Sequence, residues 1–348
     1  MTRALTRLTS GSLCSGYGGL DLAVAAVLGA RLQWTADNDD DAARVLACRF
    51  PGVPNLGDLT ALDWGAVPPV DVLTAGFPCQ DLSYAGRGAG IKEGTRSGLW
   101  HTIADAVATL RPRLLVLENV RAIVTRRPGL DVVLADLARL GFDANWTCLR
   151  ACDDGAAHER GRWFCLAWPA AHTGRPGRQG SRLPGTTAER VHPAADAAHL
   201  GHQRGGPARR RGDGPAHGGF PAAADPDRGR QRTDQHHLPA GQPHADRRRV
   251  FEWGPYAPAI ARWEATFGHP APWPVEPGRG GKLRLRPRFS EWLMGLPVGW
   301  VTDVPGTSRN GQLRLIGNGV VPLQAATAIA GLLPDHLLPA EQREGSAA

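Results

Sequence analysis

Lysine and long apolar runs are what this 348-residue chain has least of. Only Lys92 and Lys282 are lysines, so arginine supplies 38 of the 40 basic side chains. The longest apolar run, residues 22–28, has seven residues, whereas a membrane-spanning helix needs about 20. The N-terminus also lacks the apolar core of a signal peptide. We therefore expect neither an integral membrane protein nor a secreted one.

Cysteine is sparse as well, and its spacing is informative. The six cysteines, at positions 14, 48, 79, 148, 152 and 165, form no CxxC pair. This spacing argues against a disulfide scaffold and against a zinc ribbon, so we expect no metal site. Scattered single thiols in a long chain indicate a reducing compartment, the cytoplasm.

Positive charge is concentrated in one segment. Residues 172–249 contain 14 arginines and 7 acidic residues, a formal charge of +7 that equals the net charge of the whole chain. The segment also has 13 glycines, 9 prolines and one aromatic residue, Phe220, so it can bury little apolar surface. We therefore expect a basic segment that is irregular when alone. A high-GC coding bias is the ordinary explanation of the arginine excess.

Short apolar runs and amphipathic stretches alternate over residues 8–168. This β-α-β-α order predicts the α/β class and a doubly wound, Rossmann-like sheet. The predicted strands are 8–13, 32–36, 70–75, 114–117, 142–149 and 163–167, and the predicted helices are 20–28, 40–49, 99–110 and 131–140.

Changes of pattern along the chain predict its domains. We expect a ligand-binding catalytic domain over residues 1–168, a smaller irregular domain over 169–285 and a return segment over 286–348. Aromatic residues between 251 and 267 have the spacing of a short helix. The apolar stretch 320–333 predicts a final helix that packs back on the first domain.

Glycines and carboxylates follow the first predicted strands. The turn SGYGG (15–19) joins a strand to a helix, Asp37 ends the second strand, and Asp58 follows the next turn. Glycines let backbone amides approach a ligand, and a carboxylate about 20 residues later can accept ribose hydroxyls. Each Asp alone is more often a solvated turn residue, and the glycines alone a packing turn. Together they favour an adenosine-like ligand.

Three further motifs lie at strand ends, where open α/β sheets bind ligands. Cys79, in GFPCQ, is a candidate nucleophile where a positive charge favours the thiolate, although most lone cysteines are inert. Glu118, in ENV, is a candidate acid, with a helix-capping Glu-Asn pair as the alternative. Arg160 and Arg162 lead into the strand 163–167, so alternation predicts both on one side, where they could hold a carbonyl oxygen or phosphate. A solvated basic edge is the alternative for this motif.

The order of these motifs resembles a known family. GxGG, PCQ, ENV and RxR, followed by RPRFSEWLMGLPVGW (286–300) and GNGVVPLQA (317–325), look like the cytosine-C5 DNA methyltransferases of the bacterial type. The resemblance covers residues 8–168 and 284–333. The departures are Cys14, Asp37 and His158, where the family commonly has Phe, Glu and Gln.

The resemblance implies roles for particular residues. The cofactor would be S-adenosyl-L-methionine, the substrate double-stranded DNA, and residues 169–285 the target-recognition domain. The implied catalytic residues are Cys79, Glu118, Arg160 and Arg162, and the implied DNA contacts are Gln80, Ser83 and Asn119. The implied cofactor contacts are Gly16, Tyr17, Gly18, Gly19, Leu20, Asp37, Asp58, Leu59, Pro78, Leu99, Asn318 and Val320.

The implied reaction is methyl transfer to C5 of a cytosine flipped out of the duplex. Cys79 would add to C6 while Glu118 contacts N3, and loss of the C5 proton would later release Cys79. A monomer acting on DNA in the cytoplasm is expected, in a restriction-modification or phage-host protection setting that can include a restriction endonuclease. The alternatives are a tRNA cytosine-C5 methyltransferase, a non-catalytic nucleic-acid-binding relative, and a dehydrogenase, in which PCQ has no role.

Overall fold

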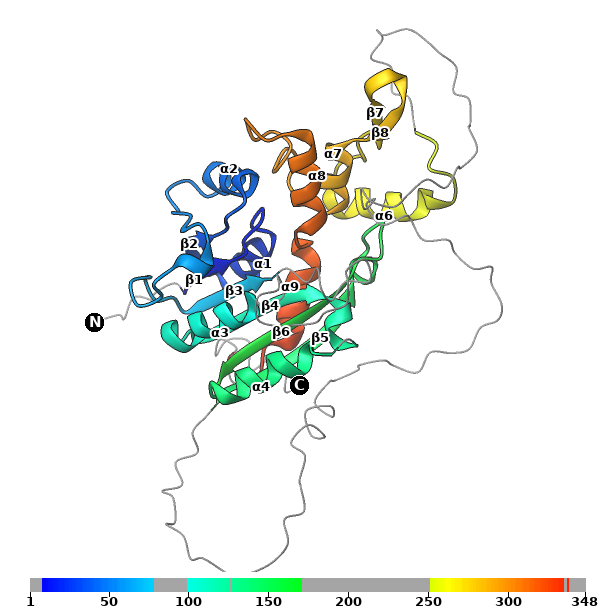
Figure 1. Ribbon diagram of the computed structural model, residues 1–348. Coiled ribbons are helices and arrows are strands. Elements are labelled where there is room, and N and C mark those ends of the chain that lie inside the picture. Colours follow the sequence, from blue (N-terminus) through cyan, green and yellow to red (C-terminus); the bar gives the residue numbers. More distant parts are fainter. Residues whose placement is uncertain (1–7, 78–98, 126, 171–250, 335–336, 338–348) are drawn as a thin grey trace, which may run out of the picture.

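A computed structural model describes residues 8–77, 99–125, 127–170, 251–334 and 337 of the chain. Its centre is a six-stranded sheet in the order β2-β1-β3-β4-β6-β5 (Figure 1). The first four strands are mutually parallel, and β6 runs antiparallel to both of its neighbours. The predicted α/β class is confirmed. The strands are β1 (Thr9–Leu13), β2 (Arg31–Ala36), β3 (Val72–Gly76), β4 (Leu114–Val120), β5 (Phe142–Arg150) and β6 (Gly161–Pro169).

Helices cover both faces of this sheet. Along β4, Leu115 and Leu117 join the core on the side of α3 and α4, whereas Leu114 and Val116 join the core on the side of α1 and α9. The second core thus contains the last long helix of the chain. The helices are α1 (Gly19–Leu28), α2 (Asp40–Arg49), α3 (Leu99–Leu110), α4 (Leu130–Arg139), α6 (Ala257–Phe267), α7 (Pro287–Leu293), α8 (Arg309–Asn318) and α9 (Pro322–Leu332).

Strand β4 is longer than its apolar run predicts. The sequence places Glu118 after a strand that ends at Leu117, but the ladder with β6 continues and pairs Glu118 with Phe164 and Val120 with Arg162. Because β6 is antiparallel, its first residues lie beside the carboxyl end of β4. This arrangement brings the RxR motif to the edge of the sheet where β1–β4 end.

A third core joins α2, α6, α7 and α8. Trp263 of α6, the helix expected from the aromatic spacing, is fully buried and donates its indole N–H to the backbone oxygen of Trp292 (2.9 Å). The buried Glu291 accepts hydrogen bonds from the backbone N–H groups of Val301 (2.6 Å) and Thr302 (2.9 Å). These contacts fix the loop between α7 and α8. A hairpin of β7 (Val275–Pro277) and β8 (Leu283–Leu285) extends beyond α7 (Figure 1).

The final helix begins two residues later than the predicted 320–333. Pro322 occupies the first turn of α9, while Val320 precedes the helix and is buried in the core shared with α1. Within the described part of the chain, Arg309–Leu332 is long and apolar enough to cross a membrane. However, it comprises two helices, α8 and α9, and half of its most apolar window is buried inside the protein. It is therefore a core element of this fold.

Candidate active site at the carboxyl edge of the sheet

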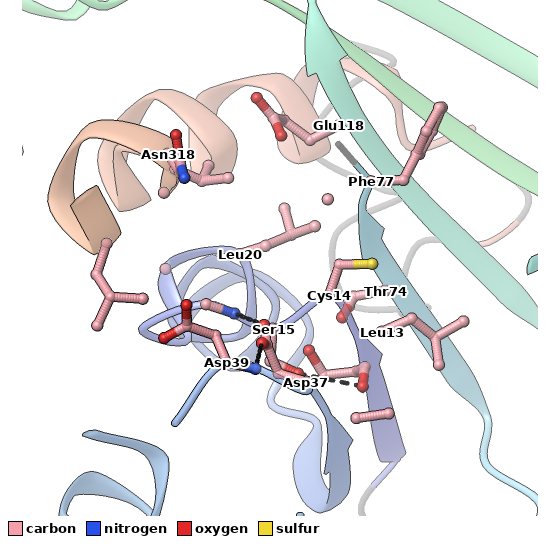
Figure 2. A pocket seen from close by; sticks show the side chains of 18 of the residues that line it. Leu13, Cys14, Ser15, Leu20, Asp37, Asp39, Thr74, Phe77, Glu118 and Asn318 are labelled. Atoms are coloured by element: carbon pink, nitrogen blue, oxygen red, sulfur yellow. Dashed lines mark hydrogen bonds between the residues drawn. The ribbon is translucent and has the colours of Figure 1, made fainter. Parts of the chain in front are cut away.

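A pocket of about 440 Å³ lies where β1–β4 end, and the segment around Asn318 forms its opposite wall. Figure 2 shows Glu118 at one end of the pocket and Asp37 and Asp39 at the other. This is the edge that the motif positions predict. The sequence-predicted residues that line the pocket are Gly16, Gly19, Leu20, Asp37, Asp58, Leu59, Leu99, Glu118, Asn119, Arg162, Asn318 and Val320.

The glycine turn is shaped by close backbone contacts. Gly18 has φ 81°, a left-handed conformation that favours glycine, and a Cβ at Gly19 would lie 2.4 Å from the backbone oxygen of Val320. The buried Tyr17 hydroxyl donates a hydrogen bond to that same oxygen (2.6 Å). Tyr17 and Gly18 therefore shape the turn, whereas Gly16, Gly19 and Leu20 face the pocket.

Carboxylates make one end of the pocket acidic. Asp37 accepts hydrogen bonds from the backbone N–H groups of Gly16 (2.8 Å) and Asp39 (2.9 Å). Burial raises the pKa of Asp37 despite these bonds. The exposed Asp58 caps a short 3₁₀ turn, and its hydrogen bonds from Thr60 lower the pKa of its carboxyl. This end of the pocket can accept hydrogen bonds from ligand hydroxyls.

An ion pair across the pocket mouth joins α8 to the start of α2. The Arg314 guanidinium lies 2.7 Å from a carboxylate oxygen of Asp39 and 3.1 Å from one of Asp41. Arg49, at the other end of α2, donates to the backbone oxygens of Trp300 (2.7 Å) and Gly299. Sequence reasoning missed Arg314, although the acidic run that begins at Asp37 was a signal that a cation lies opposite it.

The other end of the pocket holds a buried ion pair. Arg162 Nε lies 3.0 Å from Glu118 Oε1, and both side chains are largely buried. Burial raises the pKa of Glu118, and the charges of Arg162 and Arg160 oppose that rise. A Cβ at Gly76 would lie 3.4 Å from Glu118 Oε2, so glycine leaves room beside the carboxyl group. The sequence-predicted acid therefore faces the pocket with its charge partner in place.

Asn119 ties the ends of two strands together. Its side-chain amide donates to the backbone oxygen of Phe77 (3.2 Å), and its side-chain oxygen accepts from the backbone N–H of Val120. Phe77 is the residue before the PCQ motif. The predicted site residues Pro78, Cys79, Gln80 and Ser83 lie outside the described residues.

The two arginines of the RxR motif have different partners. β6 begins at Gly161 and Arg160 precedes it with φ 35°, so the strand alternation on which the expectation rests does not extend to Arg160. The Arg160 guanidinium donates to the backbone oxygens of Gly317 (2.9 Å) and Gly319, and it does not line the pocket. Burial lowers the pKa of Arg160 to about 9, so the side chain is charged at neutral pH.

Two of the residues that depart from the family pattern, Cys14 and His158, are uncharged at neutral pH. Cys14 lines the pocket in a left-handed conformation (φ 52°), and burial, with Asp37 and Asp58, raises the pKa of its thiol. Its sulfur is therefore a neutral contact surface. Burial, with the two neighbouring arginines, lowers the pKa of His158 to about 4, which leaves the ring neutral at physiological pH.

A buried carboxyl group beneath the pocket was not expected from the sequence. Asp21, in the first turn of α1, accepts hydrogen bonds from the hydroxyls of Ser12 (2.8 Å) and Thr74 (2.9 Å). Burial raises the pKa of Asp21 to about 6. Ser12 and Thr74 line the pocket floor, so Asp21 orients two of its hydroxyl groups. No motif signalled this residue, because an acid in the first turn of a helix is common.

Comparison with known proteins shows which family this part of the chain resembles. Residues 8–178 match the family model described as C-5 cytosine-specific DNA methylase. The matched residues include those that carry the glycine turn, the acidic end and the Glu118–Arg162 pair.

Two curated relatives match about half of this chain. The type II methyltransferase M.NgoBI of Neisseria gonorrhoeae is 34% identical over 158 residues, which are 45% of this chain and 49% of that protein. The type II methyltransferase M.HhaI of Haemophilus parahaemolyticus is 31% identical over 168 residues, which are 48% of this chain and 50% of that protein. The chain thus spans about half the length of these relatives.

The fold of the chain resembles that of a solved structure. The S. pombe Dnmt2 methyltransferase superposes with a TM-score of 0.53 and 14% identity, over 93% of this chain and 99% of that chain. At this identity the likeness shows the fold alone.

Proposed function

We propose that the protein is an S-adenosyl-L-methionine-dependent DNA (cytosine-5-)-methyltransferase. One observation carries this proposal: a single pocket joins an acidic end, at Asp37, to the buried Glu118–Arg162 pair. The acidic end suits a nucleoside, and the ion pair suits the polar edge of a base. Because both ends belong to one continuous pocket, a methyl donor bound at the acidic end and a pyrimidine bound at the ion pair can lie next to each other.

The pocket residues fit the proposed cofactor. Asp37 offers carboxylate oxygens to ribose hydroxyls, and Leu20, Leu59 and Leu99 supply apolar walls for an adenine ring. The Glu118 carboxyl group lies at the other end of the pocket. When bound, S-adenosyl-L-methionine supplies the methyl group as an electrophile.

The residues of the chain then act on the cytosine. The Cys79 thiolate adds to C6, Glu118 donates a hydrogen bond to N3, and this addition raises the electron density at C5. After C5 is methylated, a base removes its proton and the thiolate leaves C6. Arg162 is 3.0 Å from Glu118, so it orients the carboxyl group and stabilises negative charge that develops on the base.

The proposed substrate is double-stranded DNA with the target cytosine flipped out, because C6 must be approached from above the ring. The relatives are type II methyltransferases by name, so we propose a role in restriction-modification. The same proposal includes a matching restriction endonuclease and action as a monomer. It also includes a cytoplasmic location, where DNA is accessible. The segment 169–285 is proposed to recognise the target.

Labelled methyl transfer tests the proposal. Purified protein is incubated with S-adenosyl-L-methionine carrying a labelled methyl group and, in separate reactions, with double-stranded DNA and tRNA. We expect label at C5 of cytosine in DNA and none in tRNA, and no transfer by Cys79→Ala. Label in tRNA only would overturn the substrate, and an active Cys79→Ala variant would overturn the mechanism.

A further inference from the structure

The wall of the pocket opposite the sheet is held through its backbone oxygens. Arg160 donates to the oxygens of Gly317 (2.9 Å) and Gly319, and the Tyr17 hydroxyl donates to the oxygen of Val320 (2.6 Å). Three of the four residues 317–320 are therefore held through their backbone oxygens by two side chains from the first 168 residues, the buried Tyr17 and the partly buried Arg160.

The backbone carbonyl groups at the end of a helix need hydrogen-bond donors from outside the helix. α8 ends at Asn318, so the backbone oxygens of its last turn, which includes Gly317, and of the cap residue Gly319 have no partner inside the helix. A guanidinium there satisfies them and interacts favourably with the negative end of the helix dipole. The residues whose oxygens are held this way line the pocket, and Figure 2 shows the Asn318 side chain at the pocket.

The glycine turn 15–19 and segment 317–320 are closely packed against each other. A Cβ at Gly319 would lie 1.9 Å from the Tyr17 ring, and one at Gly19 would lie 2.4 Å from the Val320 oxygen. Arg160 itself adopts a left-handed conformation, and its backbone oxygen accepts a hydrogen bond from Gln324 of α9 (2.9 Å). Surrounding contacts thus hold Arg160 in a conformation that costs free energy, as is common at functional sites.

We propose that Arg160 and Tyr17 are positioning residues for the cofactor wall, which act through segment 317–320 and touch neither DNA nor the target base. The identity of the ligand rests on the proposed function, whereas the placement of the segment does not. The two arginines then have different roles. Arg162 orients the Glu118 carboxyl group, and Arg160 positions segment 317–320.

Hydrogen exchange and ligand binding test this proposal. The variants are Arg160→Gln, Arg160→Lys and Tyr17→Phe, with Arg139→Gln, an exposed and ion-paired arginine of α4, as the matched control. In ligand-free protein we expect exchange at residues 317–321 to rise about tenfold in Arg160→Gln, less in Arg160→Lys and Tyr17→Phe, and not in the control. S-adenosylhomocysteine binding without DNA, measured by calorimetry, should weaken about tenfold in Arg160→Gln and about threefold in Tyr17→Phe.

The kinetic signature separates positioning from chemistry. With DNA, KM for the methyl donor should rise in Arg160→Gln while kcat at saturating donor changes by less than about threefold. Unchanged exchange and binding in both Arg160→Gln and Tyr17→Phe, or a lost kcat at unchanged KM for the donor, would overturn the proposal. Should Arg160→Gln fail to fold, Tyr17→Phe decides. Wild-type protein that binds S-adenosylhomocysteine but methylates nothing would overturn the proposed function and leave the positioning result standing.

Discussion

Glu118 shows how burial equips one side chain for acid chemistry. The residue is 6% exposed, and burial raises the pKa of its carboxyl group although Arg162 lies within ion-pair distance. The protonated form therefore persists to higher pH than in a solvated glutamic acid, and that form can donate to a ring nitrogen. A neighbouring guanidinium keeps the group oriented in either protonation state.

Glu118→Gln should leave the protein folded but nearly inactive. Glutamine has the same shape but cannot serve as an acid, so we expect kcat for DNA methylation to fall by about 10²–10⁴-fold. In wild-type protein, kcat should decline as pH rises through the pKa of Glu118, and the variant should lack that decline. Steady-state kinetics across pH measure both effects; a variant with wild-type kcat would rule out this role.

Asp21 makes the folded protein sensitive to pH. Its pKa is about 6 when buried and 3.8 when solvated, so the folded state binds a proton more tightly than the unfolded state. The stability contributed by this proton is fully present below pH 3.8 and is lost as pH rises through 6. The free energy of unfolding should therefore gain about 2 kcal/mol from Asp21 between pH 7.5 and about 4.5.

Comparison with Asp21→Asn isolates this contribution. Asparagine can keep hydrogen bonds with Ser12 and Thr74 but cannot titrate. Urea unfolding at several pH values should show the stability of wild-type protein rising relative to the variant as pH falls. His158 titrates with the opposite sign in both proteins, because its pKa is lowered to about 4, so it cancels in the difference. A pH-independent difference would contradict the prediction.

At the scale of elements, α2 and α8 close the mouth of the pocket through Arg314, Asp39 and Asp41. The Arg314 side chain is about half exposed (52%), so the ion pair adds little to global stability. Its position matters more, because Arg314 and Asp39 come from different parts of the chain and both line the pocket. The pair therefore bears on ligand retention.

Arg314→Ala should weaken S-adenosylhomocysteine binding while stability changes by less than about 1 kcal/mol. We expect about threefold to tenfold weaker binding at low salt, and a smaller difference at high salt because exposed charges are screened. Calorimetry at two salt concentrations measures this. Arg44→Ala is the matched control, since Arg44 pairs with Asp41 (3.1 Å) inside α2 and bridges no two elements. Equal losses in both variants would contradict a bridging role.

At the scale of the whole molecule, charge and core are separated along the chain. The described residues form three cores that build the pocket, while residues 172–249 carry the +7 formal excess. A protein that binds a polyanion needs such a positive field, and the field need not come from the part that binds the cofactor.

Replacing residues 172–249 by a short Gly-Ser linker should weaken DNA binding and leave S-adenosylhomocysteine binding unchanged. The net charge falls from +7 to zero, so the dependence of affinity on salt concentration should become less steep. Fluorescence anisotropy with labelled duplex DNA across salt concentrations measures this slope. A variant with the segment scrambled keeps composition and length and should keep the wild-type slope. An unchanged slope after replacement would place the DNA contacts elsewhere.

Local sequence predicted most elements, but not their ends or pairings. Hydrophobic periodicity located α2 over Asp40–Arg49 and α3 over Leu99–Leu110, because these helices bury one face. The same reasoning ended β4 too early, since Glu118 and Asn119 are polar and their strand pairing depends on β6. A polar residue joins a strand when a partner strand supplies its hydrogen bonds, which no local pattern encodes.

The order of motifs in the sequence predicted the resemblance to a family. It also predicted the edge of the sheet that holds the pocket and the acidic and basic residues placed there, because strand ends and glycine turns are local properties. Only the tertiary structure decided which partner each of those residues contacts. The antiparallel course of β6 brings Arg162 to Glu118, and the return of α8 brings backbone oxygens to Arg160 and Tyr17. Such contacts join residues up to 303 positions apart, so they follow from packing of the complete fold rather than from spacing along the chain.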